Sequence, residues 1–99
     1  MPDYATKTTR LNKDSISKLP ENKPVVYRIF DNTGDNIYTG VAGRGNIQQR
    51  VREHMLRGQD PVPGGAKVQI QQKSSIDEAK RAEQNIISRS KPKYNKQGK

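Results

Sequence analysis

The stretch that decides the fold is Pro24–Gly40, PVVYRIFDNTGDNIYTG. Val25–Phe30 is a run of β-branched and aromatic residues, and a second, shorter run of the same kind follows at Asn36–Gly40. The polar segment between the two runs contains the glycine that a tight turn needs. The stretch therefore predicts a β-hairpin.

The register of this hairpin decides how its two tyrosines lie. With Thr33-Gly34 as the two turn residues, Ile29 faces Tyr38 and Tyr27 faces Gly40. In that register the two tyrosines share one face of the sheet as diagonal neighbours, about 7–8 Å apart at the backbone. A slip of one residue would separate them. Two phenols on one face indicate either packing or an active site, and the hairpin alone leaves both open.

Length and composition limit the chain to one small domain. It has 99 residues, of which 29% are hydrophobic, and this supports one modest core made of a sheet face with one or two helices. No segment approaches the length of a membrane span, and the N-terminus lacks the apolar core of a signal peptide, so we expect a soluble, cytoplasmic protein without a membrane partner. The lack of cysteine excludes disulfides, thiolate metal sites and thiol nucleophiles.

The charge of the chain points to a polyanionic partner. Nineteen Lys and Arg against ten Asp and Glu give a net charge of +9. Each phosphate that such a surface neutralises releases counterions and adds affinity, so nucleic acid is the expected partner. A solvated basic surface is the alternative, and an RNA-binding module and a nuclease have the same electrostatics.

The rest of the chain predicts an arm, a domain and a tail. Residues 1–19 are polar and basic without apolar periodicity, which predicts a flexible N-terminal arm before a domain at 20–95 and a basic tail at 96–99. Asn46 predicts the start of a helix that runs to about Arg57. Ala66–Gln72 alternates weakly and predicts a third, half-exposed strand at the edge of the sheet. The expected class is α+β.

The helix after the hairpin places an arginine and a histidine together. At 100° per residue, Ile47, Val51 and His54 fall on one stripe, with Arg50 at its edge close to the histidine. His54 is either a satisfied interfacial histidine or a catalyst. Arg50 is either a surface contact to phosphate or part of a site.

A final helix, capped by Ser74 or Ser75, encloses a glutamate in its apolar stripe. Glu83 lies among the four apolar residues of that stripe, Ile76, Ala79, Ile86 and Ile87. An ionised carboxylate in such a position is costly unless it is paired, hydrogen-bonded or bound to a metal. Glu83 therefore indicates either a structural salt bridge, to Arg50 or to a lysine, or a metal site.

Five pieces of the chain resemble the GIY-YIG endonuclease family in their order and spacing. They are Val25-Val26-Tyr27, Ile37-Tyr38-Thr39-Gly40, the Arg50 and His54 pair, Ala82-Glu83, and Pro92-Lys93-Tyr94-Asn95. The match runs from about Leu19 to Asn95, and its two ends look most like the nuclease domain of excision-repair endonucleases, with similarity to homing endonucleases as well. Three departures stand out: Val25 replaces a glycine, Thr39 replaces an isoleucine or valine, and the loop before Arg50 is longer.

The resemblance implies a small three-stranded antiparallel β-sheet flanked by helices, which hydrolyses phosphodiester bonds of DNA with one divalent metal, Mg²⁺ or Mn²⁺. By position, Tyr27 matches the proposed general base for the attacking water, Arg50 the residue that stabilises the phosphate, and Glu83 the metal ligand. Because a tyrosine has an ordinary pKa near 10, nearby cations would have to favour its phenolate. The further catalytic matches are Tyr38, His54 and Asn95, and the candidate nucleic-acid contacts are Arg44, Arg57 and Lys93.

Some alternatives stay open at the level of the sequence. The longer loop leaves Arg44 as a second candidate for the catalytic arginine, although Arg50 is favoured because it shares a helix edge with His54. A non-catalytic nucleic-acid-binding module on the same fold is the alternative function. The form of the substrate, including RNA or branched DNA, the choice between nicking and double-strand cleavage, and a partner protein or dimer that directs specificity are all left undecided.

Overall fold

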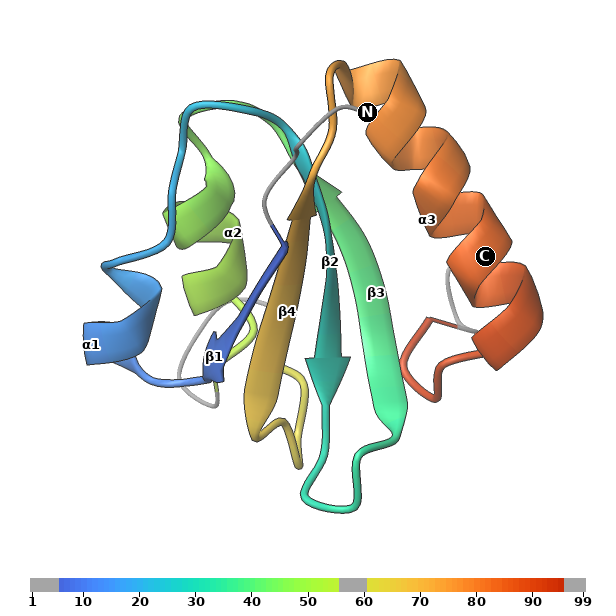
Figure 1. The fold of residues 1–99 in the computed structure, drawn as a ribbon. Coiled ribbons are helices and arrows are strands. Elements are labelled where there is room, and N and C mark those ends of the chain that lie inside the picture. Colours follow the sequence, from blue (N-terminus) through green and yellow to red (C-terminus); the bar gives the residue numbers. More distant parts are fainter. Residues whose placement is uncertain (1–5, 56–60, 96–99) are drawn as a thin grey trace.

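The computed structural model describes residues 6–55 and 61–95. These residues form a four-stranded antiparallel sheet in the order β1-β4-β2-β3, together with three helices (Figure 1). The elements are β1 (Thr6–Arg10), α1 (Lys13–Ile16), β2 (Val25–Phe30), β3 (Asn36–Ala42), α2 (Ile47–Arg52), β4 (Lys67–Gln72) and α3 (Ile76–Ser90). The α+β class and the antiparallel sheet are confirmed. The sheet has four strands where three were predicted.

The additional strand, β1, lies in the segment that was predicted to be a flexible arm. It pairs antiparallel with β4, with Lys7 opposite Ile70. Helix α1 follows, capped by Asn12, and it buries Ile16 in the core. The prediction is wrong for residues 6–19 because backbone pairing holds β1 while most of its side chains are exposed, so no apolar alternation revealed it. As a consequence, β4 is an interior strand and not the predicted edge.

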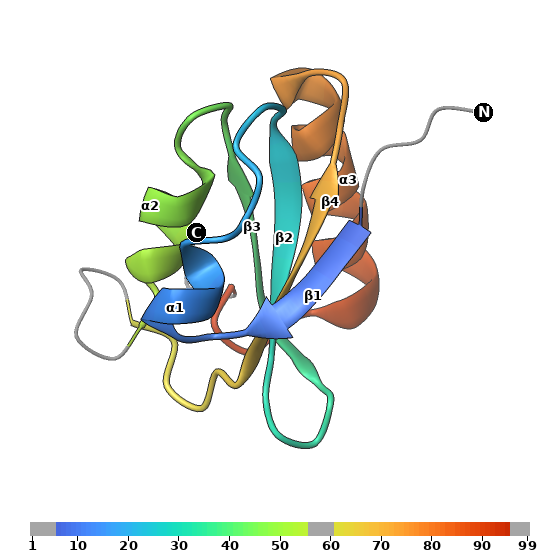
Figure 2. The ribbon, with the colours of Figure 1, turned by 60° about the vertical axis from the view of Figure 1, so that its left-hand side comes forward.

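Helices cover the two faces of the sheet (Figure 2). On the face that carries Tyr27, which we call the Tyr27 face, α1 and α2 pack over the strands and enclose the main core. This core combines helix residues with alternate strand residues, namely Ile16, Ile47, Val51, Val25, Ile29, Val68 and Ile70. Helix α3 packs against β3 and β2 on the opposite face, which carries Arg28 and which we call the Arg28 face. There Val26 and Ala79 are buried outside the main core.

The hairpin has the predicted register at its tyrosines. Tyr27 lies opposite Gly40, and Ile29 lies opposite Tyr38. The rings of the two tyrosines lie 6.2 Å apart between centroids, on the same face. The prediction that they share a face is therefore confirmed.

The tip of the hairpin differs from the prediction. The Asp31 amide donates to the Asp35 carbonyl at 3.0 Å, and the Gly34 amide donates to the Asp31 carbonyl at 3.1 Å, so three residues form the loop. Gly34 has a φ of 90°, which only glycine adopts without strain. A bulge between Ile29 and Phe30 then corrects the pairing by one residue. The prediction of a two-residue turn is wrong. Because the bulge shifts the pairing back by one residue, the two tyrosines still share a face as predicted.

Helix α2 begins at the predicted place and ends earlier. Asn46 is at the N-cap position, but its side chain makes no capping bond; instead the Glu21 carboxylate accepts the Ile47 amide at 3.0 Å. The helix ends at Arg52, and the predicted end at Arg57 lies outside the described residues. Helix α3 begins after Ser75, whose hydroxyl accepts the Glu78 amide at 3.2 Å, as the sequence predicted. Of the helices in 6–55 and 61–95, none is long and apolar enough to cross a membrane.

Candidate active site

Tyr27 is the centre of the site, and its side chain lies directly over Gly40 of the neighbouring strand. The residue is 0 % exposed. A Cβ atom built on Gly40 would lie 2.6 Å from the Tyr27 hydroxyl oxygen and 3.0 Å from the Tyr38 ring. Only glycine therefore leaves room for the phenol at this point of β3. From the sequence, Gly40 was placed opposite Tyr27 and within a motif, but its role in shaping the site was missed.

Three aromatic rings meet on the Tyr27 face. The Tyr27 hydroxyl and His54 Nε2 form a buried hydrogen bond of 2.6 Å. The Tyr38 ring lies 4.5 Å from the His54 ring between centroids, and the Tyr27 ring lies 5.5 Å from it. Tyr38 is the half-buried member of the three, whereas Tyr27 and His54 are enclosed. The sequence predicted these three residues as site residues, and the structure brings them together.

His54 is held in place from both sides of its backbone. It follows the last turn of α2, where its amide donates to the Val51 carbonyl at 3.0 Å. Its own carbonyl accepts the Val62 amide at 3.0 Å. The residue is 1 % exposed. Two backbone hydrogen bonds and near-complete burial fix the ring that Tyr27 contacts.

Burial dominates the electrostatics of Tyr27. Desolvation raises the pKa of its phenol well above the ordinary value, and the nearby Tyr38 raises it further. Arg50 acts in the opposite direction, while Glu83 and Glu53 again raise the pKa. The charge of Arg50 does not offset the effect of burial, so the Tyr27 phenol keeps its proton. A general base would need the phenolate.

Arg50 and Glu83 act on each other as well as on Tyr27. Burial raises the pKa of the Glu83 carboxyl, and Lys80 and then Arg50 lower it. Arg50 itself is exposed, and its guanidinium lies 3.8 Å from the Glu53 carboxylate. Glu53 was not singled out in the sequence, although the i, i+3 spacing from Arg50 on a helix could have indicated the pair.

Glu83 is half-buried on α3, as its place in the apolar stripe suggested. Within residues 6–55 and 61–95 its carboxylate makes no hydrogen bond and no ion pair. The stripe itself is less regular than predicted, because Ala79 is fully buried while Ile76 is 38 % exposed. The structural salt bridge that was the alternative for Glu83 is not formed among the described residues.

The other candidates lie apart from the three rings. Arg44 is exposed and lines a hollow with Lys23 and Ser74. Asn95 uses its whole amide on Thr39: its Oδ1 accepts the Thr39 amide at 2.7 Å, and its Nδ2 donates to the Thr39 carbonyl at 2.9 Å. These bonds fasten the segment after α3 to β3, which is a structural use of the side chain. Lys93 is exposed, and Arg57 lies outside the described residues.

The family of the chain follows from the fold, the site and the sequence comparison together. The family model described as the GIY-YIG catalytic domain matches residues 23–95. The chain belongs to the GIY-YIG endonuclease family. Strand β1 and helix α1 precede the matched segment.

Two relatives place the chain more narrowly within this family. It is similar to the UvrABC system protein C of Prosthecochloris aestuarii, with 35% identity over 103 residues that cover 96% of this chain and 16% of that protein. The chain thus spans only a small part of that relative's length. It is also similar to the crystal structure of the GIY-YIG N-terminal endonuclease domain of UvrC from Thermotoga maritima, a point mutant bound to its catalytic divalent cation. That match has a TM-score of 0.62 and 31% identity, and it covers 81% of this chain and 93% of the other.

Proposed function

We propose that this chain is a divalent-metal-dependent endonuclease that hydrolyses phosphodiester bonds of DNA. The observation that carries the proposal is the buried 2.6 Å hydrogen bond between the Tyr27 hydroxyl and His54 Nε2. The charges of Arg50 and Glu83 both act on this phenol. The endonuclease domain of the similar UvrC structure and the net charge of +9 support the same function.

The hydrogen bond gives the proton of the attacking water a path. With neutral His54 protonated at Nδ1, the Tyr27 hydroxyl donates to Nε2. Tyr27 then accepts a proton from water as it passes its own to the imidazole, so no isolated buried phenolate has to form. This relay removes the difficulty that burial creates for Tyr27 as a general base. In the proposal, the Arg50 guanidinium neutralises charge on the scissile phosphate.

Access to Tyr27 depends on Tyr38. Because Tyr27 is 0 % exposed, the attacking water cannot contact its hydroxyl in the conformation seen here. The half-buried Tyr38 ring packs against both Tyr27 and His54. In the proposal, substrate binding displaces this ring and exposes the relay.

Glu83 is the residue that would hold the metal: its helix α3 packs on the Arg28 face, but against β3 at the edge of the sheet, and the Glu83 charge still acts on the Tyr27 phenol. Its carboxylate is half-buried and makes no hydrogen bond or ion pair within the described part of the chain, so an oxygen ligand is available. Among residues 6–55 and 61–95 there is no cluster of three or more Asp, Glu, His or Cys side chains that could hold a metal ion. Water and substrate would therefore have to supply the other ligands. One carboxylate completed by water and substrate phosphate is how Mg²⁺ or Mn²⁺ sites of this kind are built. The metal would supply a Lewis acid for the charge that grows on the phosphate.

Cleavage of a supercoiled plasmid tests the proposal. We expect nicking with Mg²⁺ or Mn²⁺, none in EDTA, and a loss of about 10²-fold or more in Glu83→Gln, which keeps the shape of the side chain and removes the ligand charge. Asp77→Asn is the matched control, because it removes one carboxylate from an exposed position on the same helix. We expect it to cleave like the wild type.

Two outcomes would contradict the proposal. If the wild-type chain binds DNA and does not nick it with any divalent metal, the chain is a binding module on the nuclease fold. Equal activity of Glu83→Gln and Asp77→Asn would remove Glu83 from the metal site. Parallel assays with RNA, with branched DNA and with a candidate partner protein decide the substrate and whether a partner or a second copy directs the cut.

A further inference from the structure

The Arg28 face of the sheet is only partly covered by helix. Helix α3 packs against β3 and β2, whereas β4 and β1 continue the sheet beyond it (Figure 1). Strand β1, outside the matched catalytic domain, widens this open part by one strand. The open part therefore combines one strand of the matched domain with one strand that precedes it.

The strand register places a set of polar and cationic side chains together there. Thr8 of β1 lies opposite Gln69 of β4, which lies opposite Arg28 of β2. The Gln69 Nε2 donates to the Thr8 hydroxyl at 3.3 Å, which confirms that the two side chains point to the same face. The next row, about 7 Å along the strands, contains Arg10, Lys67 and Phe30.

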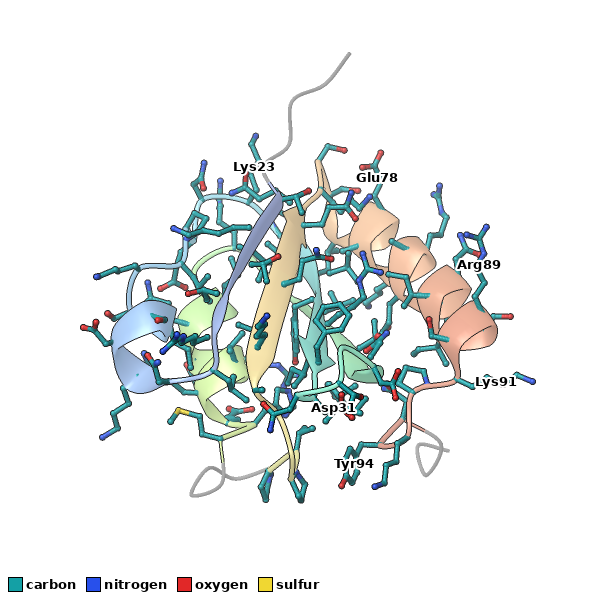
Figure 3. The ribbon with its side chains drawn as sticks, turned by 60° about the horizontal axis from the view of Figure 1, so that its bottom comes forward. Lys23, Asp31, Glu78, Arg89, Lys91 and Tyr94 are labelled. Atoms are coloured by element: carbon teal, nitrogen blue, oxygen red, sulfur yellow. The ribbon has the colours of Figure 1, made fainter. Side chains whose placement is uncertain are left out.

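A hollow deepens this face near the hairpin. It has a volume of about 710 Å³, with Arg28 and Phe30 from β2 among its lining residues, and Lys91 and Lys93 from the segment after α3. Figure 3 labels Lys91 at the end of α3 and Asp31 at the hairpin end of the sheet. Two carboxylates, Asp31 and Asp35, also line the hollow, so its three cations exceed its anions by one. The Asp31 Oδ1 accepts the amide and the hydroxyl of Thr33 and is used by the turn, and Asp35 is exposed.

Arg28 contributes to this face a charge that is available to a ligand. Its side chain is half-buried in the lining of the hollow. Within residues 6–55 and 61–95 it makes no hydrogen bond and no ion pair. A half-buried guanidinium without a partner is suited to bind an external anion, and a phosphate matches its planar set of donors.

We propose that the Arg28 face binds a single-stranded polynucleotide. Its phosphates lie against five cations, Arg10, Arg28, Lys67, Lys91 and Lys93. One base stacks on Phe30, and the amide of Gln69 offers hydrogen bonds to exposed base edges. A duplex hides the base faces and edges that these side chains recognise. The surface lies on the other side of the sheet from Tyr27 and His54 and does not depend on the chemistry proposed for them.

Fluorescence anisotropy of the full chain with a labelled oligothymidine, in EDTA so that no cleavage occurs, tests the inference. The test variant is Arg28→Gln with Lys67→Gln, and the matched control, Lys13→Gln with Lys18→Gln, removes the same charge from exposed positions on and beside α1. We expect the test variant to bind about tenfold more weakly at low salt, with a salt slope smaller by about 1.4 for two lost phosphate contacts. We expect the control to stay within about twofold of the wild type.

Further arms make the result decisive. The two substitutions of the test variant should weaken binding of a duplex competitor less than they weaken binding of the single strand. Phe30→Leu should weaken binding of the single strand and leave binding of the duplex unchanged. Equal losses in the test and control variants, or equal losses for single strand and duplex, would overturn the proposal. If the double variant does not fold, Lys67→Gln alone, at an exposed position, must show the same direction with a slope change of about 0.7. Because metal and cleavage are absent, failure here is separate from failure of the nuclease function.

Discussion

Successive residues of one strand, β2, supply two surfaces with opposite physical character. Tyr27 points to the Tyr27 face, where it is 0 % exposed and hydrogen-bonded to His54 at 2.6 Å. Its neighbour Arg28 points to the Arg28 face and lines an open hollow without a partner among the described residues. The first surface encloses a few fixed groups away from water, and the second presents a charge to water.

This difference predicts different sensitivities. On the Tyr27 face, a change of one atom can remove a hydrogen bond or create a clash, because the groups are enclosed and cannot rearrange. On the Arg28 face, cations contribute in small, roughly independent amounts that salt weakens. The largest effects are therefore expected on the enclosed Tyr27 face.

The largest effect should come from Tyr27→Phe. Losing the hydroxyl would remove the proposed proton relay, and we expect cleavage to fall by about 10²–10⁴-fold. Tyr38→Phe is the matched comparison, since it removes the same atom from the half-buried ring that covers the relay. Single-turnover cleavage of a labelled duplex measures both. If the loss is greater in Tyr38→Phe, then Tyr38 and not Tyr27 takes the proton from water.

A smaller but still large effect should come from Gly40→Ala. The new methyl group would lie 2.6 Å from the Tyr27 hydroxyl, so the phenol must move away from His54. We expect a loss of about 1–3 kcal/mol in the free energy of unfolding, the usual range for overpacking, together with weaker cleavage. Gly43→Ala is the control, because nothing lies within 4 Å of its added carbon. Urea unfolding that gives equal stability for both variants would show that the clash is relieved cheaply.

The sequence allowed the Tyr27 face to be predicted better than the rest of the molecule. Alternation along β2 and β3 identifies which strand side chains share a face, because this period is fixed by backbone geometry. The predicted helical pairing of Arg50 with His54 is not reproduced, because α2 ends at Arg52 and His54 follows it. The proximity of Tyr27, Tyr38 and His54 could still be predicted from the residues and from the family resemblance. The complete burial of Tyr27 could not, since it depends on α2 and the following segment packing over the ring.

The Arg28 face was largely missed because its signals are weak in sequence. Strand β1 has no buried alternating side chains, so its threonines were interpreted as a loose arm. Without β1, β4 was predicted to be an edge strand, and no feature of the sequence distinguishes Lys67 from a solvated surface charge. The amide of Asn95 was interpreted as catalytic, whereas its bonds to Thr39 depend on a contact between residues 56 positions apart. Such long-range pairings have no local signature.

The smallest expected effect concerns the response of stability to alkaline pH. Burial raises the pKa of Tyr27 above its ordinary value of about 10, so in the folded state the phenol keeps its proton where the unfolded chain releases it. The folded state then binds more protons than the unfolded state, and stability must fall as the pH rises above about 10. The contribution is fully present below that pH, and its loss is limited to about 1.4 kcal/mol per pH unit.

Comparison with Tyr27→Phe isolates this term from the other groups that titrate in the same range. At neutral pH the wild type should be the more stable protein, because the variant leaves His54 Nε2 without its partner from Tyr27. Above pH about 10 the advantage should shrink, since only the wild type has a buried phenol whose proton must be kept. Urea unfolding at a series of pH values measures the difference. Parallel curves for the two proteins would mean that solvent reaches the Tyr27 hydroxyl readily, and the contrast between an enclosed and an open face would then be weaker than the structure indicates.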